Sequence, residues 1–418
     1  MRVALVGPFN GSSLRQEFPS LGEGAGLPPG YPGAPLMTTL ARALVDRGHD
    51  VAAISTCYST PVSELEPFRH WERRTGRDID VYFCPQRSRS FRSSSGRRGR
   101  AVDFFRFERD GLRAAINHFQ PELIHAHWTY EFVWAALDSG IPTLATAHDS
   151  PSKVLRYMPN LYRLVRYAMA RHVIGRCPHL TAVSPDLERD IRGWASRPVT
   201  VVPNPIPSTM LESPGCEPQA FTSRTLVMAL NGWIQLKNGA NALRAFQLAR
   251  EVDRSLRLLC FGADYEPGGA AHRWAKAHQC TDGVEFRGPT PHHQMMDEFR
   301  RSMALLHPSR LEACSMSIGE SMSLGLPVIA GRRTGGVAWQ LDGGRAGVLV
   351  DVNDAASMAQ AILSLSADAA IWTQLSSAAR ARARQLFRLE PIVDAYVDLY
   401  GAVRRELPHR LMAAASAL

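Results

Sequence analysis

The segment Leu305–Gly336, LLHPSRLEACSMSIGESMSLGLPVIAGRRTGG, has apolar runs, a polar loop and a glycine-rich end. This order predicts a strand, a loop, a helix, a second strand and a second loop. The helix is predicted to begin near Ser315 or Ser317, because either hydroxyl can cap free backbone N–H groups. It is predicted to end at Gly325, since glycine accepts the left-handed conformation that closes many helices. The final loop, Gly331–Gly336, would let a ligand approach the backbone closely.

Two glutamates in this segment, Glu312 and Glu320, are separated by seven residues. Glu312 is expected in the loop before the helix and Glu320 within it. The helix N-terminus between them offers unpaired N–H groups and a positive dipole end, which favour a diphosphate. Each carboxylate can accept hydrogen bonds from two neighbouring hydroxyls, so one could hold a sugar and the other a ribose. The alternative is that Glu312 only complements the helix dipole and Glu320 is a solvated helix residue.

The run His307–Ala330 resembles the signature of the retaining GT-B glycosyltransferases of glycosyltransferase family 4 (group 1). The family pattern is Pro-Ser, a glutamate, seven residues, a second glutamate with a small residue and methionine, Gly-x-Pro-Val-Ile-Ala, and a Thr-Gly-Gly loop. Each part is present here in order and at the right spacing. The resemblance implies two Rossmann-like, doubly wound parallel-sheet domains of the α/β class facing a central cleft. It also implies transfer of a sugar, with retention, from a nucleotide-diphosphate sugar to a hydroxyl acceptor that is a glycan, a lipid-linked molecule or a small molecule.

The whole chain alternates short apolar strands with amphipathic helices, which predicts α/β structure with parallel sheets. Its 418 residues are enough for two domains with separate cores. By the resemblance, residues 1–206 form an N-terminal acceptor-side domain, and residues 207–389 form the domain that binds the nucleotide sugar. The last helix, 390–418, is expected to pack back on the first domain.

A lysine and an asparagine precede the first predicted helix of the second domain. A lysine at a helix N-terminus can neutralise a diphosphate as a point charge. The family pattern is Gly-Arg, a few residues, then Lys-Gly or Lys-Asn, and both basic residues contact the phosphates. Lys237 and Asn238 match it, but Trp233 follows Gly232 where the arginine is expected. The second cation is either absent or supplied by another residue, such as Arg332 or Arg333.

The resemblance implies a set of site residues on both domains. Three belong to the reaction centre: Glu312, which would hold the donor-sugar hydroxyls, His148 and Lys237. The others bind the donor: Glu320, which would hold the ribose, and Met316, Ser317, Ser315, Asn238, Gly232 and Arg287. It implies no metal, no cofactor and no assigned protein nucleophile.

His148 follows a predicted strand, and doubly wound sheets place their sites at strand ends. The alternative is a loop histidine bonded to its neighbours. His125 and His127 point to the same side of an earlier strand if that strand continues. A metal pair completed by His148 or Asp149 stays open as an alternative, although the resembled family commonly carries such a pair without a metal.

The net charge of +9 and the pI near 9.4 indicate an anionic partner. Nucleic acid is not expected, because the sequence has no zinc finger and no RNA-binding aromatic motif. Arginines and phenylalanines crowd the segment Arg87–Arg109. This segment is either a mobile basic loop or a patch that docks on an anionic membrane surface or a phosphorylated lipid acceptor.

The compartment is expected to be the cytoplasm, with peripheral binding to the inner face of the cell membrane as a further expectation. No run is long and apolar enough to span a membrane, and the first residues, MRVALVGPFNGSS, predict a strand rather than a signal peptide. The seven cysteines are scattered, which favours reduced thiols. The Gly- and Pro-rich stretch Asn10–Pro35 is expected to be a functional loop. Within it, Gly33-Ala34 is the nearest match to a Gly-Gly turn of the family.

Two other functions stay open. One is a GT-B sugar-nucleotide epimerase. The other is a non-catalytic GT-B-like scaffold, which the missing arginine, the altered glycine turn and Pro205 in place of a family glycine would allow. Donor hydrolysis without an acceptor would separate an enzyme from a scaffold.

Overall fold

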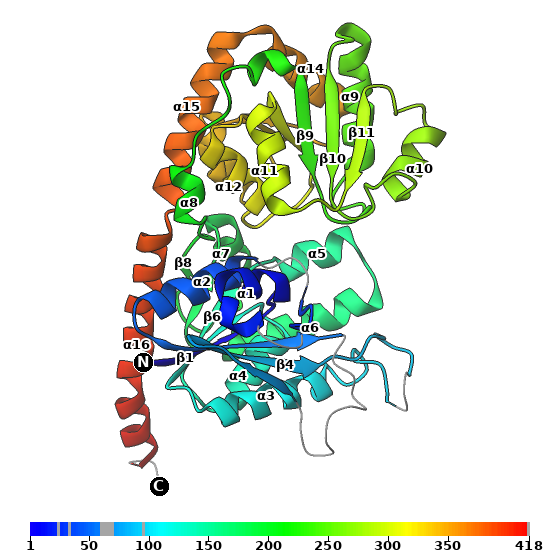
Figure 1. Cartoon of the computed structure of the whole chain (residues 1–418). Coiled ribbons are helices and arrows are strands. Elements are labelled where there is room, and N and C mark those ends of the chain that lie inside the picture. Colours follow the sequence, from blue (N-terminus) through cyan, green and yellow to red (C-terminus); the bar gives the residue numbers. More distant parts are fainter. Residues whose placement is uncertain (23–25, 32–34, 59–70, 94–96, 416–418) are drawn as a thin grey trace. The chain divides into compact units, whose positions relative to one another are not determined.

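The computed structural model describes residues 1–22, 26–31, 35–58, 71–93 and 97–415, with residues 35 and 406–415 described through their backbone alone (Figure 1). The chain divides into two compact units. Unit 1 is Met1–Pro205 together with Leu389–Leu418, and unit 2 is Ile206–Arg388. Each division lies one residue from the boundary expected from the sequence. The turn Gly33-Ala34 lies outside the described residues.

The described part of unit 1 contains an eight-stranded sheet in the order β3-β4-β2-β1-β5-β6-β7-β8. Its strands are β1 (Arg2–Val6), β2 (Asp50–Cys57), β3 (Glu72–Thr75), β4 (Ile79–Pro85), β5 (Leu123–His127), β6 (Thr143–Ala147), β7 (Leu180–Ala182) and β8 (Thr200–Val201). All neighbours are parallel except β3 and β4 at one edge. Strands covered on both faces need apolar residues throughout, and β1, β5 and β6 are buried almost from end to end.

Helices cover both faces of this sheet (Figure 1). They are α1 (Gly11–Glu17), η1 (Pro19–Gly22), α2 (Pro35–Asp46), α3 (Arg106–Phe119), α4 (Glu131–Asp138), α5 (Pro151–Tyr157), α6 (Leu161–Arg176), α7 (Pro185–Ile191) and α16 (Leu389–Ala415). The expectation of a loop over residues 10–35 is wrong for its first part. Asn10 caps α1 there by accepting hydrogen bonds from the backbone N–H groups of Ser12 and Ser13. The last helix joins the same core, where Tyr396 and Tyr400 pack with the buried residues of β1 and β2.

Unit 2 contains a six-stranded, fully parallel sheet in the order β11-β10-β9-β12-β13-β14. Its strands are β9 (Thr225–Ala229), β10 (Arg257–Phe261), β11 (Val284–Gly288), β12 (Ala304–His307), β13 (Val328–Gly331) and β14 (Val348–Val350). This is the 3-2-1-4-5-6 order of doubly wound folds. The strand order therefore reverses between β9 and β12, where such sheets bind their ligands.

Helices flank this second sheet on both faces, with α9 and α14 on one face and α11 and α12 on the other (Figure 1). The helices are α8 (Ser208–Glu212), η2 (Phe221–Ser223), α9 (Gly239–Val252), α10 (Ala270–Ala277), α11 (His292–Arg301), α12 (Met316–Leu324), α13 (Val337–Gln340), η3 (Asp342–Gly344), α14 (Ala355–Ala367) and α15 (Ala369–Leu386). The predicted ends of α12 are confirmed. Ser315 caps it by accepting from the N–H of Ile318, and Gly325 closes it in the left-handed conformation with φ 72°.

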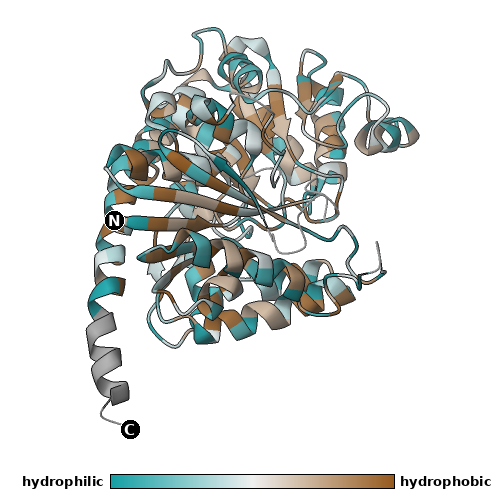
Figure 2. Ribbon diagram, turned by 60° about the horizontal axis from the view of Figure 1, so that its bottom comes forward, coloured by the Kyte–Doolittle hydropathy of each residue, from teal (hydrophilic) through white to brown (hydrophobic). Residues whose placement is uncertain are grey.

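The hydrophobic colouring runs along the strands of both sheets, and the helices carry both colours (Figure 2). This pattern is that of amphipathic helices packed on buried strands. No helix in the described ranges has the length and apolar character to cross a membrane.

Candidate functional site

The two loops at the point where the strand order of unit 2 reverses bring Lys237 and Glu312 together. Lys237 lies in the loop after β9, and Glu312 lies in the loop after β12. Lys237 Nζ donates to Glu312 Oε1 at 2.6 Å. The N–H of Arg310 also donates to the carbonyl of Leu236 at 2.9 Å and ties the loops together. Two residues predicted for the reaction centre are therefore direct partners.

Glu312 is held as a carboxylate by its neighbours. Its side chain is 15% exposed. Burial alone would raise its pKa, but the Lys237 ammonium and a contact with His307 outweigh burial and hold the pKa well below its ordinary value. His307 Nε2 lies 3.4 Å from Glu312 Oε1. His307 is the last residue of β12 and was not among the predicted site residues.

The helix α12 begins at Met316, shortly after Glu312 in the chain, and the predicted residues Ser315 and Ser317 lie at its N-terminus. Ser315 Oγ is 3.1 Å from Ser317 Oγ, and Ser317 Oγ is 3.4 Å from His307 Nδ1. Gln340 clamps Ser315 from α13: its Oε1 accepts from the Ser315 N–H at 2.9 Å, and its Nε2 donates to the Ser315 carbonyl at 3.0 Å. The first N–H groups of a helix, here those of Met316 and Ser317, have no partner within the helix. Such N–H groups can bind an anion.

Glu320 lies further along α12 and has a partner that the sequence did not reveal. Its Oε1 is 2.9 Å from His292 Nε2 at the start of α11. The hydrogen bond that His292 donates to this carboxylate raises the pKa of the histidine, against the opposing effect of burial. His292 is the first residue of α11 and its side chain is 52% exposed, so Glu320 binds a histidine at the protein surface. Proximity in sequence gave no signal, because 28 positions separate the two residues.

Asn238 and Gly232 shape the loop after β9. Asn238 is buried in the left-handed conformation with φ 58°, and its Nδ2 donates to the carbonyls of Pro308 at 3.1 Å and Val352 at 2.7 Å. Both amide hydrogens are thus used inside unit 2, so this side chain clamps the loop. Gly232 has φ 86°, a region that favours glycine.

Arg287 and Arg332, two arginines considered for donor binding, each have a partner within unit 2. Arg287 on β11 pairs with Glu285 at 2.6 Å, and within the described ranges no hydrogen bond or ion pair joins it to Lys237 or Glu312. Arg332, considered as the second phosphate cation, donates to the carbonyl of Leu349 at 2.9 Å. Arg332 is therefore bound to the backbone of β14, and the prediction that Arg287 binds the donor stays a prediction.

In unit 1, His148 follows β6 and pairs with His127 at the end of β5. His127 Nδ1 is 2.8 Å from His148 Nε2, and the two rings stack with centroids 5.1 Å apart. Burial lowers the pKa of His148 to about 4 and that of His127 well below its ordinary value. His125 instead contacts Tyr400 Oη at 2.7 Å and Thr146 Oγ1 at 2.8 Å. Within the described part of the chain no group of three or more His, Cys, Asp or Glu side chains could hold a metal ion.

The basic segment Arg87–Arg109 is not one uniform surface. Arg87 is buried and donates to Glu108 Oε2 at 2.7 Å and to Asp103 Oδ1 at 2.8 Å. Arg100 is buried too and lies over the rings of neighbouring tyrosines. These two arginines belong to the interior, so a docking surface can use only the exposed ones: Arg89, Arg92, Arg97, Arg98 and Arg106. Residues 94–96 of the segment lie outside the described residues.

Two family models match the chain, one mainly over unit 1 and the other within unit 2. Residues 35–209 match Glycosyltransferase Family 4, and residues 224–368 match Glycosyl transferases group 1. Together the two matched segments cover most of the chain.

Curated relatives carry related names. The chain is 23% identical to the N-acetyl-alpha-D-glucosaminyl L-malate synthase of Bacillus anthracis, over 88% of this chain and 93% of that protein. It is 26% identical to the D-inositol 3-phosphate glycosyltransferase of Corynebacterium diphtheriae, over 64% of this chain and 67% of that protein.

Solved structures show the same fold. The sucrose-phosphate synthase of Thermosynechococcus elongatus superposes with a TM-score of 0.73 at 18% identity, over 99% of this chain and 100% of that one. HepE of Anabaena in complex with UDP-glucose superposes with a TM-score of 0.67 at 15% identity, over 96% of this chain and 100% of that one. With two parallel-sheet α/β units, both family matches and these neighbours, the chain belongs to the GT-B glycosyltransferases, with a family 4 segment followed by a group 1 segment.

Proposed function

We propose that the chain is a retaining glycosyltransferase that moves a sugar from a nucleotide-diphosphate donor to a hydroxyl acceptor, and that unit 2 binds the donor. The observation that carries this proposal is the Lys237–Glu312 pair beside the N-terminus of α12. It combines a cation, backbone N–H groups and a carboxylate at the point where doubly wound sheets bind ligands. The UDP-glucose complex of the structural neighbour HepE supports a sugar nucleotide as the donor.

The same proposal gives each group one task. Lys237 and the N–H groups of Met316 and Ser317 stabilise the negative charge that develops on the leaving diphosphate. Glu312, kept ionised by Lys237, accepts hydrogen bonds from hydroxyls of the donor sugar. Glu320 accepts from the ribose hydroxyls in place of His292. No metal or cofactor is assigned a role, and a contribution of His148 to transfer is proposed on its position at the end of β6.

For the acceptor, we propose a lipid-linked or membrane-bound molecule on an anionic surface in the cytoplasm. The exposed arginines of 87–109 are accompanied by three exposed apolar side chains: Phe91, Val102 and Phe104. Such residues suit an interface where arginines meet anionic headgroups and aromatic rings enter the boundary region. Sedimentation with vesicles containing phosphatidylserine tests this proposal, and equal recovery in the supernatant with and without the anionic lipid would refute it.

The donor assignment is tested by a thermal-shift panel of UDP-, GDP-, ADP- and TDP-sugars on the wild type, Glu320→Ala and Glu251→Ala. Glu251 is an exposed residue of α9 and serves as the matched control. We expect one nucleotide class to stabilise the wild type and Glu251→Ala, and not Glu320→Ala. With the donor known, proton NMR of the anomeric signal of the product tests retention.

Three results would count against the proposal. An absence of stabilisation by every donor would favour the scaffold. Conversion of the donor to its epimer without transfer would favour the epimerase. An inverted anomeric centre in the product would exclude retention.

A further inference from the structure

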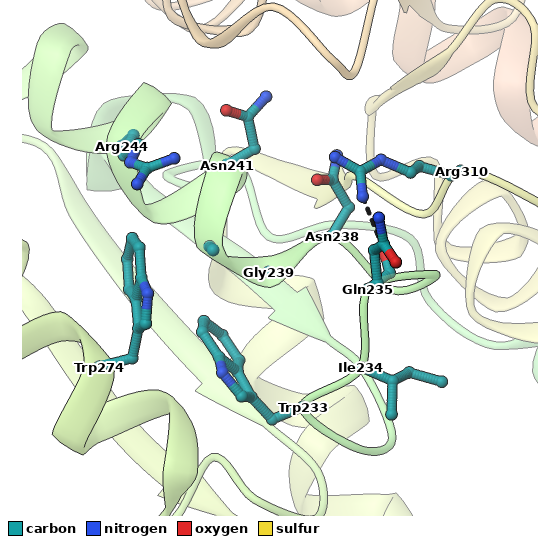
Figure 3. Close-up of a pocket in the computed structure, with 10 residues that line it drawn as sticks. Trp233, Ile234, Gln235, Asn238, Gly239, Asn241, Arg244, Trp274 and Arg310 are labelled. Atoms are coloured by element: carbon teal, nitrogen blue, oxygen red, sulfur yellow. Dashed lines mark hydrogen bonds between the residues drawn. The ribbon is translucent and has the colours of Figure 1, made fainter. Parts of the chain in front are cut away.

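Unit 2 has a pocket that is lined by Asn238 but not by Lys237 or Glu312 (Figure 3). It encloses about 550 Å³ of empty space, counting the part that opens to solvent. The lining residues come from the loop after β9, the first turns of α9, the helix α10 and Arg310.

Two tryptophans form one wall of the pocket. The ring centroids of Trp233 and Trp274 are 5.5 Å apart, and the rings are tilted by 47°. Each ring is fixed from behind: Trp233 meets Tyr265 edge-on at 5.8 Å, and Trp274 stacks on His278 at 4.1 Å. The two indoles therefore form a rigid, half-buried apolar surface. Because they touch each other, they leave no slot between them into which a nucleotide base could insert.

Two arginines supply the charge of the pocket. The Arg244 guanidinium lies 5.0 Å from the ring centroid of Trp274. Arg310 is held by the Oδ1 of Asn353 at 2.8 Å and by the carbonyl of Gln235 at 2.9 Å. Figure 3 shows these two arginines on opposite sides of the pocket, with the indoles below them. No aspartate or glutamate lines the pocket, and within the described ranges neither arginine forms an ion pair with a carboxylate.

This combination favours one class of ligand. The C–H bonds of a pyranose face carry small positive partial charges and pack on the negative face of an indole. Guanidinium groups without an acidic partner favour a phosphate or a carboxylate, which they bind through paired hydrogen bonds. We propose that this pocket is a second site of unit 2, separate from the Lys237–Glu312 pair, and that it binds an anionic monosaccharide. The sugar ring lies on Trp233 and against the edge of Trp274, whose faces contact His278 and Arg244, and the anionic group meets Arg244 or Arg310.

Isothermal titration calorimetry on the full chain tests the site with four probes: glucose 6-phosphate, glucuronate, glucose and inorganic phosphate. Binding of either anionic sugar is expected. Comparison of glucose 6-phosphate with glucuronate shows whether the pocket prefers a phosphate or a carboxylate. Glucose and inorganic phosphate should each have an affinity at least about tenfold lower than that of the anionic sugar. Glucose lacks the anionic group, and inorganic phosphate lacks the sugar ring. The probe that binds is then carried to the variants.

Arg244→Gln should weaken binding of that probe about tenfold, the effect of losing one charge-assisted contact. Arg254→Gln is the matched control, because the side chain of Arg254 is 71% exposed and lies outside the pocket. Trp274→Phe, which keeps an aromatic ring, is a second variant that should also weaken binding. Circular dichroism melting curves verify that the variants are folded.

Separation from the donor site is tested with the double variant Lys237→Met and Glu312→Gln, which leaves neither charge without its partner. Its affinity for the anionic sugar should equal that of the wild type. Absence of binding by both anionic sugars, undiminished affinity in folded Arg244→Gln, or loss of binding in the folded double variant would each overturn the proposal.

Discussion

Lys237 Nζ lies 2.6 Å from Glu312 Oε1, although 75 positions separate the two residues in the chain. Each comes from the loop after one of two neighbouring strands, β9 and β12, at which the strand order reverses. The side chains are 24% and 15% exposed, so the pair is largely desolvated. A largely desolvated pair of this kind depends on both partners, because removal of one leaves the other charge uncompensated.

The first prediction concerns the energetic coupling between Lys237 and Glu312. Lys237→Met and Glu312→Gln should each lower the free energy of unfolding by about 1–3 kcal/mol, because each leaves one buried polar partner unsatisfied. The double variant should lose less than the sum of the two. Urea denaturation of all four proteins measures the coupling. The exposed pair Arg106–Asp110 on α3 is the control cycle and should show almost none. Additive effects of Lys237→Met and Glu312→Gln would show that the two residues do not stabilise each other.

Local signals in the sequence were enough to predict the ends of α12 and the alternation of strands and helices, but they missed α1. Ser315 and Gly325 mark the ends of α12 by their own chemistry, and the apolar runs mark the strands. The partners of the site residues depend on tertiary packing and left no local signal. No residue near Glu320 in the sequence indicates that His292 is its partner. The sequence also gives no reason to expect different burial for Arg87 and Arg89. Only the structure shows that Arg87 is buried against Glu108, whereas Arg89 is exposed.

The second prediction follows from the pKa of Glu312, which is lowered in the folded chain relative to its ordinary value of 4.5. A lowered acid pKa means that the unfolded chain takes up the proton first as the pH falls. The stabilisation from Glu312 is therefore complete above about pH 4.5 and decreases below it. The difference in unfolding free energy between wild type and Glu312→Gln should be constant from pH 7 to about pH 5 and shrink on further acidification. Urea denaturation at a series of pH values measures it, and a difference that grows in acid would contradict the assignment.

The third prediction concerns His292, whose pKa is raised by Glu320. The ion pair between protonated His292 and Glu320 is fully formed below the ordinary pKa of histidine. It is lost as the pH rises through the raised pKa of His292. If Glu320 takes the ribose, protonated His292 competes with the donor, so nucleotide affinity should rise with pH over this interval. His292→Ala should bind the nucleotide about two- to fivefold more tightly at pH 6 and show a flatter pH profile, as expected for a half-exposed pair.

Calorimetric titration of the nucleotide at several pH values measures this effect. His293→Ala is the matched control, because His293 is the exposed neighbour of His292 on the same helix. A parallel pH profile in wild type and His292→Ala would show that the histidine does not compete at Glu320.

The fourth prediction concerns His148, a partly buried histidine of unit 1. Burial lowers the pKa of His148 to about 4, so the unfolded chain binds its proton near pH 6.5 while the folded chain does not. Stability should therefore fall between pH 6.5 and about 4, by up to about 1.4 kcal/mol per pH unit for each such histidine. His148→Asn should show a shallower decline in urea denaturation. The exposed His293→Asn should keep the wild-type slope, and an unchanged slope in His148→Asn would contradict the prediction.

The fifth prediction separates the backbone role of Asn238 from its side-chain role. Asn238→Gly keeps the left-handed conformation available but removes the donors to Pro308 and Val352, so it should lower the unfolding free energy by about 1–3 kcal/mol. Asn238→Ala should cost about 1 kcal/mol more, because alanine is strained at φ 58°. Gln279 is the control: it has φ 54° and is exposed, so Gln279→Gly should be close to neutral. Urea denaturation gives all three values. If Asn238→Gly were as stable as the wild type, the amide would not clamp the loop, and the position of Lys237 would depend on its pairing with Glu312 and on the Arg310–Leu236 backbone hydrogen bond.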